Sequence, residues 1–141
     1  MTPLYTAEAV STGQGRDGEV RSSDGVINEQ LATPTELGGP GGAATNPEQL
    51  FAAGYSACFH SAVRAAAARS GTPVRRSEVT AKVGIGADES DGGFRLSVDL
   101  EVRIPELTQP QANEIVEAAQ QLCPYSKATR GNIDVSVSAV V

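Results

Sequence analysis

Apolar and polar residues alternate along several short stretches of this chain, which is the pattern of β-strands. Before the first helical stretch we expect strands over Leu4–Ser11, Glu19–Ser22 and Val26–Ala32. Ser23-Asp24-Gly25 fits a tight turn between the last two. Thr33–Pro47 is rich in Gly and Pro and is expected to be a loop. The chain is therefore predicted to begin as three short strands followed by a long loop.

The first predicted helix has a clear start and end. Thr45 or Asn46 is its cap, Pro47 fits its first turn, and Glu48 stands where a capping box places an acidic residue. The helix is expected to end near Arg69, just before a Ser-Gly pair. It is by far the longest helix that the pattern predicts.

The rest of the chain predicts two long strands, a second helix and a last strand. The long strands cover residues 79–85 and 95–104, the helix extends from the cap Thr108 to Cys123, and the last strand covers 133–141. The element order is then β-β-β-α-β-β-α-β. Strands with one polar face indicate the α+β class, with a largely antiparallel sheet, two main helices on one side of it, and a single domain over residues 1–141.

Composition narrows the function classes. The net charge is −6 and the pI is about 4.7, which argues against a nucleic-acid partner. We expect neither a signal peptide nor a membrane span, and so a cytoplasmic location. In that compartment a disulfide between the two cysteines is expected to be transient and catalytic. With three Tyr, three Phe and no Trp, the chain has little core volume, so we expect extra apolar burial between subunits.

Cys58 and Cys123 are the only pair of residues with both the chemistry and the packing context of an active site. Small residues share the helical face of each, and small side chains allow two thiols to approach. The residues on the face of Cys58 are Phe51, Gly54, Ala62 and Ala65, and those on the face of Cys123 are Ala112, Val116 and Ala119. Two inert core cysteines in a non-catalytic binding domain are the alternative. Two Cys and one His are too few for a structural zinc site.

Other candidate chemistry is weaker. His60 lies two residues after Cys58, so about 200° of helical rotation separates the two side chains. The Gly-rich loop lacks the Gly-Lys-Ser/Thr ending of a phosphate-binding loop. Cys58 lies well inside its helix, beyond the reach of the helix N-terminus, so a reactive thiolate there needs a cation from elsewhere. The candidate cations are Arg16, Arg64, Arg69 and Lys127, of which Arg16 stands out because it lies in a glycine-rich loop.

Four stretches resemble the organic hydroperoxide resistance (Ohr) proteins of the Ohr/OsmC superfamily. They are the motifs GRDG (15–18), SSDG (22–25), ELGGPGGAATNPEQLFAAGYSACF (36–59) and CPYSKATRGNIDV (123–135). The resemblance implies an OsmC-like fold and a thiol peroxidase that reduces organic hydroperoxides to alcohols. It implies that Cys58 is the attacking cysteine, Cys123 the resolving one, and that Arg16 and Glu48 complete the site.

The resemblance also implies how the protein is recycled. No bound cofactor or metal is expected, and the reductant is an external dithiol, a dihydrolipoyl group on a lipoylated protein or free dihydrolipoamide. The form of the motif around Cys58 favours the Ohr branch, whereas an OsmC-branch peroxidase with another peroxide preference is the nearest alternative.

The spacing of Glu48 and Cys58 predicts a dimer. Ten residues along one helix is about 15 Å, which is too far for Glu48, even through Arg16, to serve Cys58 of the same helix without strain. We therefore expect an intertwined, obligate homodimer in which each site takes Arg16 and Glu48 from one chain and both cysteines from the other.

Overall fold

The computed structural model describes all 141 residues of the chain. They form two compact units, Met1–Leu50 and Phe51–Val141, and each unit contains a three-stranded sheet of its own. The prediction of one sheet was therefore wrong, because the strands form two separate sheets. The single domain expected over residues 1–141 stays a prediction.

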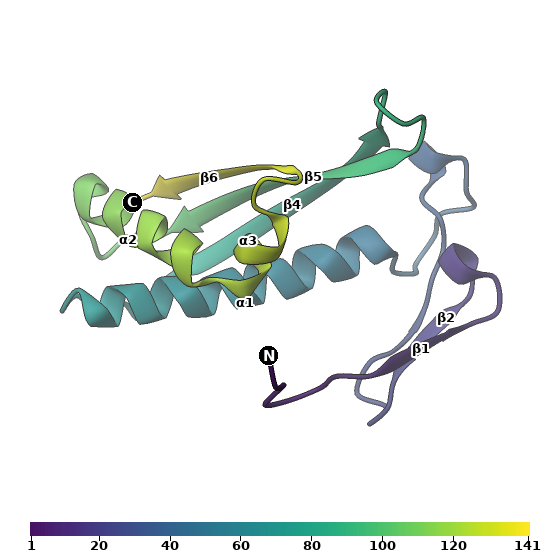
Figure 1. Ribbon diagram of the computed structural model, residues 1–141, viewed down its shortest axis with the longest axis horizontal. Helices are drawn as coiled ribbons and strands as arrows, with labels where there is room; N and C mark the ends of the chain where they lie inside the picture. The colour runs from purple at the N-terminus through teal and green to yellow at the C-terminus, as the bar shows by residue number, and fades with distance from the viewer. The chain divides into compact units, whose positions relative to one another are not determined.

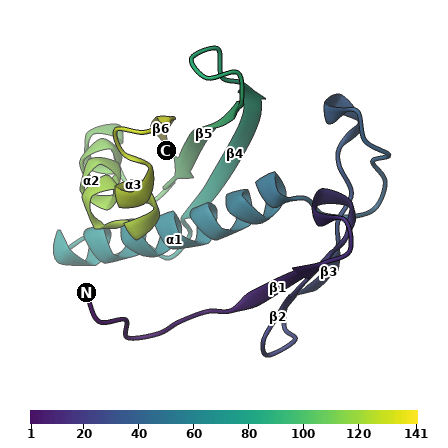
Figure 2. The ribbon, with the colours of Figure 1, turned by 45° about the vertical axis from the view of Figure 1, so that its right-hand side comes forward.

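The first unit is an antiparallel ribbon with two short 3₁₀ turns, drawn in purple to dark blue in Figure 2. Its strands β1, β2 and β3 pair in sequence order. The strands are Ala9–Thr12, Glu19–Ser22 and Asn28–Gln30, and the turns are η1, Gly15–Asp17, and η2, Thr35–Leu37.

Two of these strands are shorter than the sequence predicts. β1 begins at Ala9, which pairs with Ser22, the last residue of β2, so the residues before Ala9 have no strand to pair with. β3 begins at Asn28, because the turn after Ser22 extends through Val26, whose N–H donates to the Asp24 carboxylate over 3.0 Å. Alternation alone did not reveal where the neighbouring strand ends.

The first unit buries very little apolar surface. Leu31 is its only buried apolar side chain, whereas Val10 is 56% exposed and Ile27 is 44% exposed. Burial of apolar surface is the main favourable term in folding. A unit of this size with one buried apolar side chain therefore lacks a core of its own.

The second unit is a helix-covered sheet (Figure 1). The long helix α1 (Pro47–Arg69) begins at the end of the first unit, and the shorter helices α2 (Gln109–Leu122) and α3 (Pro124–Thr129) follow β5. The strands are β4 (Glu78–Ala87), β5 (Phe94–Arg103) and β6 (Asp134–Val140). β4 and β5 are antiparallel as predicted, but β6 runs parallel to β5.

All three helices lie on one face of this sheet, as the alternation in the strands predicted (Figures 1 and 2). On β5, Val98, Leu100 and Val102 are buried while Asp99 and Glu101 between them are exposed. The buried side chains from the helices include Tyr55, Phe59, Val63, Ile115 and Val116. The apolar side chains of β4 and β6 are only partly buried against this core.

The helix ends differ in how well the sequence predicted them. Thr108 caps α2 as expected, and the structure adds a complete capping box with Gln111. At α1 the cap is the second of the two expected candidates, because the Asn46 side chain accepts from the N–H of Gln49 over 2.8 Å. The predicted role of Glu48 in a capping box is wrong, since its carboxylate binds Arg16 instead.

The second predicted helix does not contain Cys123 within it. α2 ends at Leu122, Cys123 has an extended backbone, and α3 begins at Pro124. A proline has no N–H and is accommodated at the first position of a helix, so it ends one helix here and starts the next. Cys123 therefore lies at the junction of two helices.

Candidate functional site

The two cysteine thiols lie close together. Cys58, in the middle of α1, and Cys123, at the junction of α2 and α3, have their sulfur atoms 3.6 Å apart, and both are free thiols. Cys123 is fully buried and Cys58 is partly exposed. A disulfide needs the sulfur atoms to close to about 2.05 Å, which is a short movement from this position. The expected approach of the two cysteines is confirmed.

The small residues predicted to permit this approach contribute unequally. Gly54 lies directly beneath the ring of Tyr125, because a Cβ at position 54 would lie 2.9 Å from the Tyr125 hydroxyl oxygen. Ala62 is buried in the core, whereas Ala65 is exposed and takes no part in it. The predicted face of α1 is therefore correct near Cys58 and wrong one turn beyond Ala62.

Three aromatic rings pack beside the thiols. The ring centre of Tyr125 lies 5.6 Å from that of Tyr55 and 6.3 Å from that of Phe51. The residues of α1 in this cluster lie three and seven positions before Cys58, on the same side of the helix. Tyr55 and Tyr125 were not predicted as site residues from the sequence, although the four-residue spacing of Phe51, Tyr55 and Phe59 was a visible signal.

The surroundings of Cys58 within the second unit disfavour its thiolate. Burial raises the pKa of the Cys58 thiol above its ordinary value, and the neighbouring Cys123 raises it further. The backbone N–H of Tyr125 opposes this rise in pKa, because it favours the negatively charged thiolate. A thiolate at neutral pH therefore requires a positive charge beyond what this unit provides around the sulfur.

Arg16 and Glu48 form a two-pronged ion pair within the first unit. Arg16 Nη1 donates to Glu48 Oε2 over 2.9 Å, and Nη2 donates to Oε1 over 2.6 Å. The Arg16 guanidinium lowers the pKa of the Glu48 carboxyl, and Glu48 raises the pKa of Arg16. The Glu48 side chain is 11% exposed and the Arg16 side chain 40%. The pair fixes the direction of a guanidinium that remains accessible.

The turn that carries Arg16 is itself held in place. The Asp17 carboxylate accepts from the Thr33 N–H over 2.8 Å and from the Thr33 hydroxyl over 3.0 Å. Gly18 closes the turn, and a Cβ at this position would lie 2.2 Å from the Thr12 carbonyl oxygen. Only glycine fits there, so the GRDG motif is needed to form the turn.

The structure therefore brings the four predicted site residues together as two pairs. Cys58 meets Cys123 in the second unit, and Arg16 meets Glu48 in the first. His60 is not a partner of Cys58, as expected from the helical rotation, since its Nε2 is 2.9 Å from the Ser77 hydroxyl.

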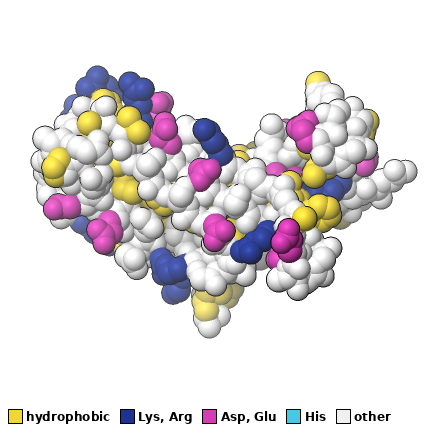
Figure 3. Space-filling view, turned by 90° about the horizontal axis from the view of Figure 1, so that it is seen from above, with side chains coloured by type: hydrophobic (Ala, Val, Ile, Leu, Met, Phe, Trp, Pro, Cys, Tyr) yellow, Lys and Arg dark blue, Asp and Glu magenta, His cyan; other side chains and the backbone are white.

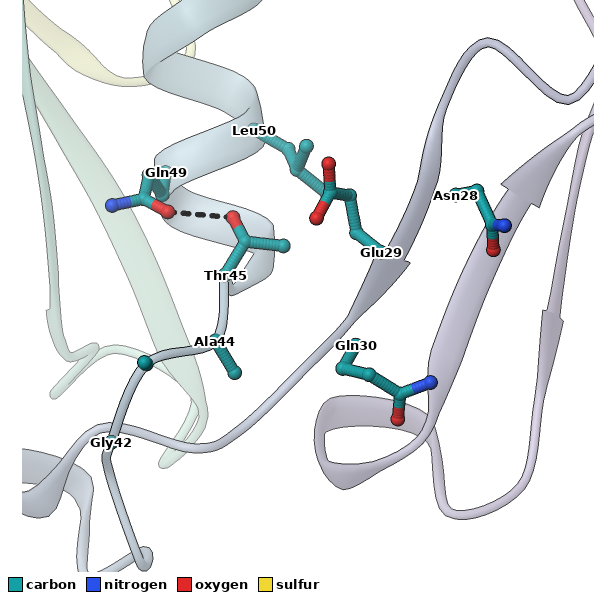
Figure 4. Close-up of a pocket in the computed structure, with 9 residues that line it drawn as sticks. Asn28, Glu29, Gln30, Gly42, Ala44, Thr45, Gln49 and Leu50 are labelled. Atoms are coloured by element: carbon teal, nitrogen blue, oxygen red, sulfur yellow. Dashed lines mark hydrogen bonds between the residues drawn. The ribbon is translucent and has the colours of Figure 1, made fainter.

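One hollow in the first unit contains no such chemistry. It is an open cavity of about 610 Å³ between β3 and the start of α1, lined by polar and small side chains including Gln30, Ala44 and Gln49 (Figure 4). Its one ionisable side chain is Glu29, and neither cysteine lines it. Thr45 donates to the side-chain oxygen of Gln49 across one wall over 2.7 Å.

Metal and surface features add little to the site. No group of three or more His, Cys, Asp or Glu side chains is placed to hold a metal ion. None of the helices combines the length and the apolar character needed to cross a bilayer. On the face shown in Figure 3, basic and acidic side chains are interspersed rather than gathered into one basic patch.

Comparison with known proteins places the chain in a family. Residues 39–138 match the model of the OsmC-like protein family. The organic hydroperoxide resistance protein of Xanthomonas axonopodis pv. citri is 47% identical over 135 residues, which cover 96% of this chain and 94% of that protein. OhrB of Bacillus subtilis is 45% identical over 134 residues, covering 95% of this chain and 96% of that protein.

A solved structure supports the same family. The structure of an organic hydroperoxide resistance protein from Legionella pneumophila, also described as a predicted redox protein, is 46% identical. It superposes with a TM-score of 0.93 over 99% of this chain and 100% of its own. The match extends over both units of the fold and includes the segments that carry both pairs of site residues. The chain is therefore a member of the organic hydroperoxide resistance (Ohr) proteins, within the OsmC-like family.

Proposed function

We propose that this protein is a thiol peroxidase that reduces organic hydroperoxides to alcohols. The observation that carries the proposal is the pair of free thiols 3.6 Å apart, one partly exposed and one buried, beside three aromatic rings. The partly exposed Cys58 suits attack on an incoming peroxide, and the buried Cys123 suits the second step. The aromatic surroundings favour an organic hydroperoxide over hydrogen peroxide.

The proposed reaction has three steps. The Cys58 thiolate attacks the outer peroxide oxygen, the O–O bond breaks, and the alkoxide leaves as the alcohol after taking a proton. The resulting Cys58 sulfenic acid condenses with the Cys123 thiol, forming a disulfide and releasing water. An external dithiol of the dihydrolipoyl type then reduces the disulfide, and its own two thiols become a disulfide. Two free cysteines that cycle in this way suit the reducing cytoplasm.

In this proposal Arg16 provides the positive charge that the Cys58 thiolate needs. Burial raises the pKa of Cys58, and a fixed guanidinium nearby would lower it. Glu48 holds the guanidinium by two charge-assisted hydrogen bonds, so that it can also donate to a peroxide oxygen.

The test measures consumption of cumene hydroperoxide and of hydrogen peroxide with dihydrolipoamide as reductant. We expect turnover with the organic peroxide, none for Cys58→Ser, and a single round for Cys123→Ser that leaves one oxygen on Cys58 in the mass spectrum. A preference for hydrogen peroxide would contradict the Ohr-type substrate. Unreactive thiols in the folded protein would support the alternative of a binding domain with two core cysteines.

We also propose that the working form is an intertwined homodimer. The first unit has one buried apolar side chain, and the apolar residues of β4 and β6 in the second unit are only partly covered. Each unit by itself therefore leaves apolar surface that a second copy can bury, as the interfaces of obligate dimers do.

Mixing two inactive variants tests whether the dimer shares its sites. A Cys58→Ser chain and a Glu48→Ala chain are combined under conditions that exchange subunits. If each site uses Glu48 of one chain and Cys58 of the other, some mixed dimers contain one complete site and activity returns. If exchange is confirmed by mass spectrometry and activity stays absent, the site lies within a single chain.

A further inference from the structure

Three hydroxyl groups are buried together between α1 and α3. The Tyr55 hydroxyl oxygen lies 2.9 Å from Ser126 Oγ and 3.1 Å from Thr129 Oγ1. Tyr55 is fully buried, and Ser126 and Thr129 are the only polar residues of the chain that are buried. Thr129 Oγ1 also lies within 3.3 Å of the Ser126 carbonyl, to which it donates. Every buried side-chain donor and acceptor has a partner in this arrangement.

Helix α3 depends on this cluster for its position. It has six residues, of which Ser126 and Thr129 are the buried ones, while Pro124, Tyr125 and Lys127 are exposed. A helix of this length has little stability of its own and takes its position from tertiary contacts. The inward contacts of α3 include these two hydroxyls on Tyr55 and the Tyr125 ring, which packs on the backbone of α1 at Gly54 and against the rings of Tyr55 and Phe51.

The start of α3 carries the two groups that meet Cys58. Cys123 directly precedes the helix and places its sulfur 3.6 Å from that of Cys58. The backbone N–H of Tyr125, in the first turn, lowers the pKa of the Cys58 thiol. A shift of α3 along α1 would displace the resolving thiol and this donor at the same time.

We infer that the Tyr55 hydroxyl is a positioning group that fixes α3, so that Cys123 and the Tyr125 N–H stay against Cys58. Hydrogen bonds are directional and their lengths vary little, whereas apolar contacts alone let packed helices slide. Burial makes a shift of α3 unfavourable, because any shift that breaks these bonds leaves buried hydroxyls without partners. The inference rests on the proposed function only for the use of the two thiols, and it is tested without peroxide.

The principal variant is Tyr55→Phe, which keeps the ring and removes the hydroxyl. In the chain that retains both cysteines, the equilibrium between the dithiol and the Cys58–Cys123 disulfide is measured against reduced and oxidised glutathione. We expect the disulfide to form at least about fivefold less favourably, because fivefold corresponds to the loss of one typical hydrogen bond and the Tyr55 hydroxyl takes part in two. In a Cys123→Ser background, the pH profile of Cys58 alkylation is expected to shift to higher pH.

A second pair of variants separates the hydroxyl from the shape of the side chain. Thr129→Val keeps the shape and removes the hydroxyl, so both measurements should move in the same direction as for Tyr55→Phe. Thr129→Ser keeps the hydroxyl and should stay near wild type. This pair decides the question if Tyr55→Phe does not fold.

Ser77→Ala is the matched control. It removes a side-chain hydrogen bond, to His60 on the same helix α1, that has no contact with α3. It should lower the melting temperature without moving either thiol measurement. If Tyr55→Phe and Thr129→Val also lower only the melting temperature, the hydroxyl cluster is merely structural and the inference is wrong. Because neither measurement uses a hydroperoxide, this outcome is independent of whether the protein is a peroxidase.

Discussion

Formation of a disulfide between Cys58 and Cys123 should stabilise the fold. The number of residues between the two cysteines sets the size of this stabilisation. Cys58 and Cys123 are 65 positions apart, and their sulfurs need to close from 3.6 Å to about 2.05 Å to form a bond. Cross-linking a loop of this length removes conformational entropy from the unfolded chain worth about 4 kcal/mol near 25 °C. Strain from the remaining movement subtracts from this value, so about 4 kcal/mol is the upper limit.

The assay is urea unfolding of the reduced and the diamide-oxidised protein at one protein concentration. Diamide takes two electrons and two protons from the thiol pair, so no peroxide chemistry is involved. Since a cross-link makes the unfolded state more compact, it lowers the urea dependence of the unfolding free energy, and the values extrapolated to water are the ones to compare. We expect the oxidised protein to be more stable by between 2 and about 4 kcal/mol.

Cys123→Ser treated with diamide is the control, and its stability should not change. The reasoning is refuted if mass spectrometry shows the Cys58–Cys123 bond within one chain while the oxidised and reduced forms unfold with equal free energies. It is also refuted if diamide links cysteines only between chains, since the observed approach of the sulfurs then has no chemical consequence.

Three further predictions follow from the site and the core. Arg16→Ala should shift the pH profile of Cys58 alkylation to higher pH. Arg16→Lys should restore the profile only partly, because an ammonium lacks the planar fork that pairs with a carboxylate. Equal profiles in wild type and both variants would contradict this. Because the folded-state pKa of Glu48 lies below its ordinary 4.5, the Arg16–Glu48 pair should stabilise the protein above about pH 4.5 by at most about 1 kcal/mol, and this contribution is lost as the pH falls through the folded-state pKa. The unfolding free energies of wild type and Glu48→Gln should therefore differ at pH 7 and converge as the pH is lowered; a difference that does not change with pH would contradict this. Phe59→Ala should cost about 3–5 kcal/mol of unfolding free energy because the ring is fully buried, whereas Ala57→Ser on the exposed side of α1 should cost under about 1 kcal/mol.

The sequence predicted the elements that depend on local pattern. The limits of α1, the Thr108 cap and the alternation of β5 all follow from residues within a few positions of one another, and the structure confirms them. The direction of β6 did not follow in this way. Its apolar alternation fits either orientation, and the parallel pairing with β5 depends on the path of the helices between them.

The site shows the same division between local and distant signals. The approach of Cys58 and Cys123 could be predicted because each lies among small residues at helical spacing. The pattern at the helix start gave Glu48 a local role in a capping box, whereas the family resemblance gave it a place in the site with Arg16. Arg16, 32 positions away in the chain, takes its carboxylate, so the local prediction was wrong and the one from the resemblance is confirmed for this pairing. When a side chain has two available partners, the tertiary structure decides which of them it binds. A motif at the start of a helix carries no information about that choice.

The raised pKa of Cys58 explains why the proposed mechanism needs residues from both units. An aromatic, partly buried site favours an organic peroxide, but the same surroundings disfavour the thiolate that attacks it. The two demands conflict within Phe51–Val141, where the only opposing contribution to the pKa is one backbone N–H. A guanidinium held by a carboxylate resolves the conflict, because it brings a full positive charge that burial cannot neutralise, whereas a buried lysine loses its proton more readily. This is the physical reason to expect an arginine at position 16 and a carboxylate at position 48.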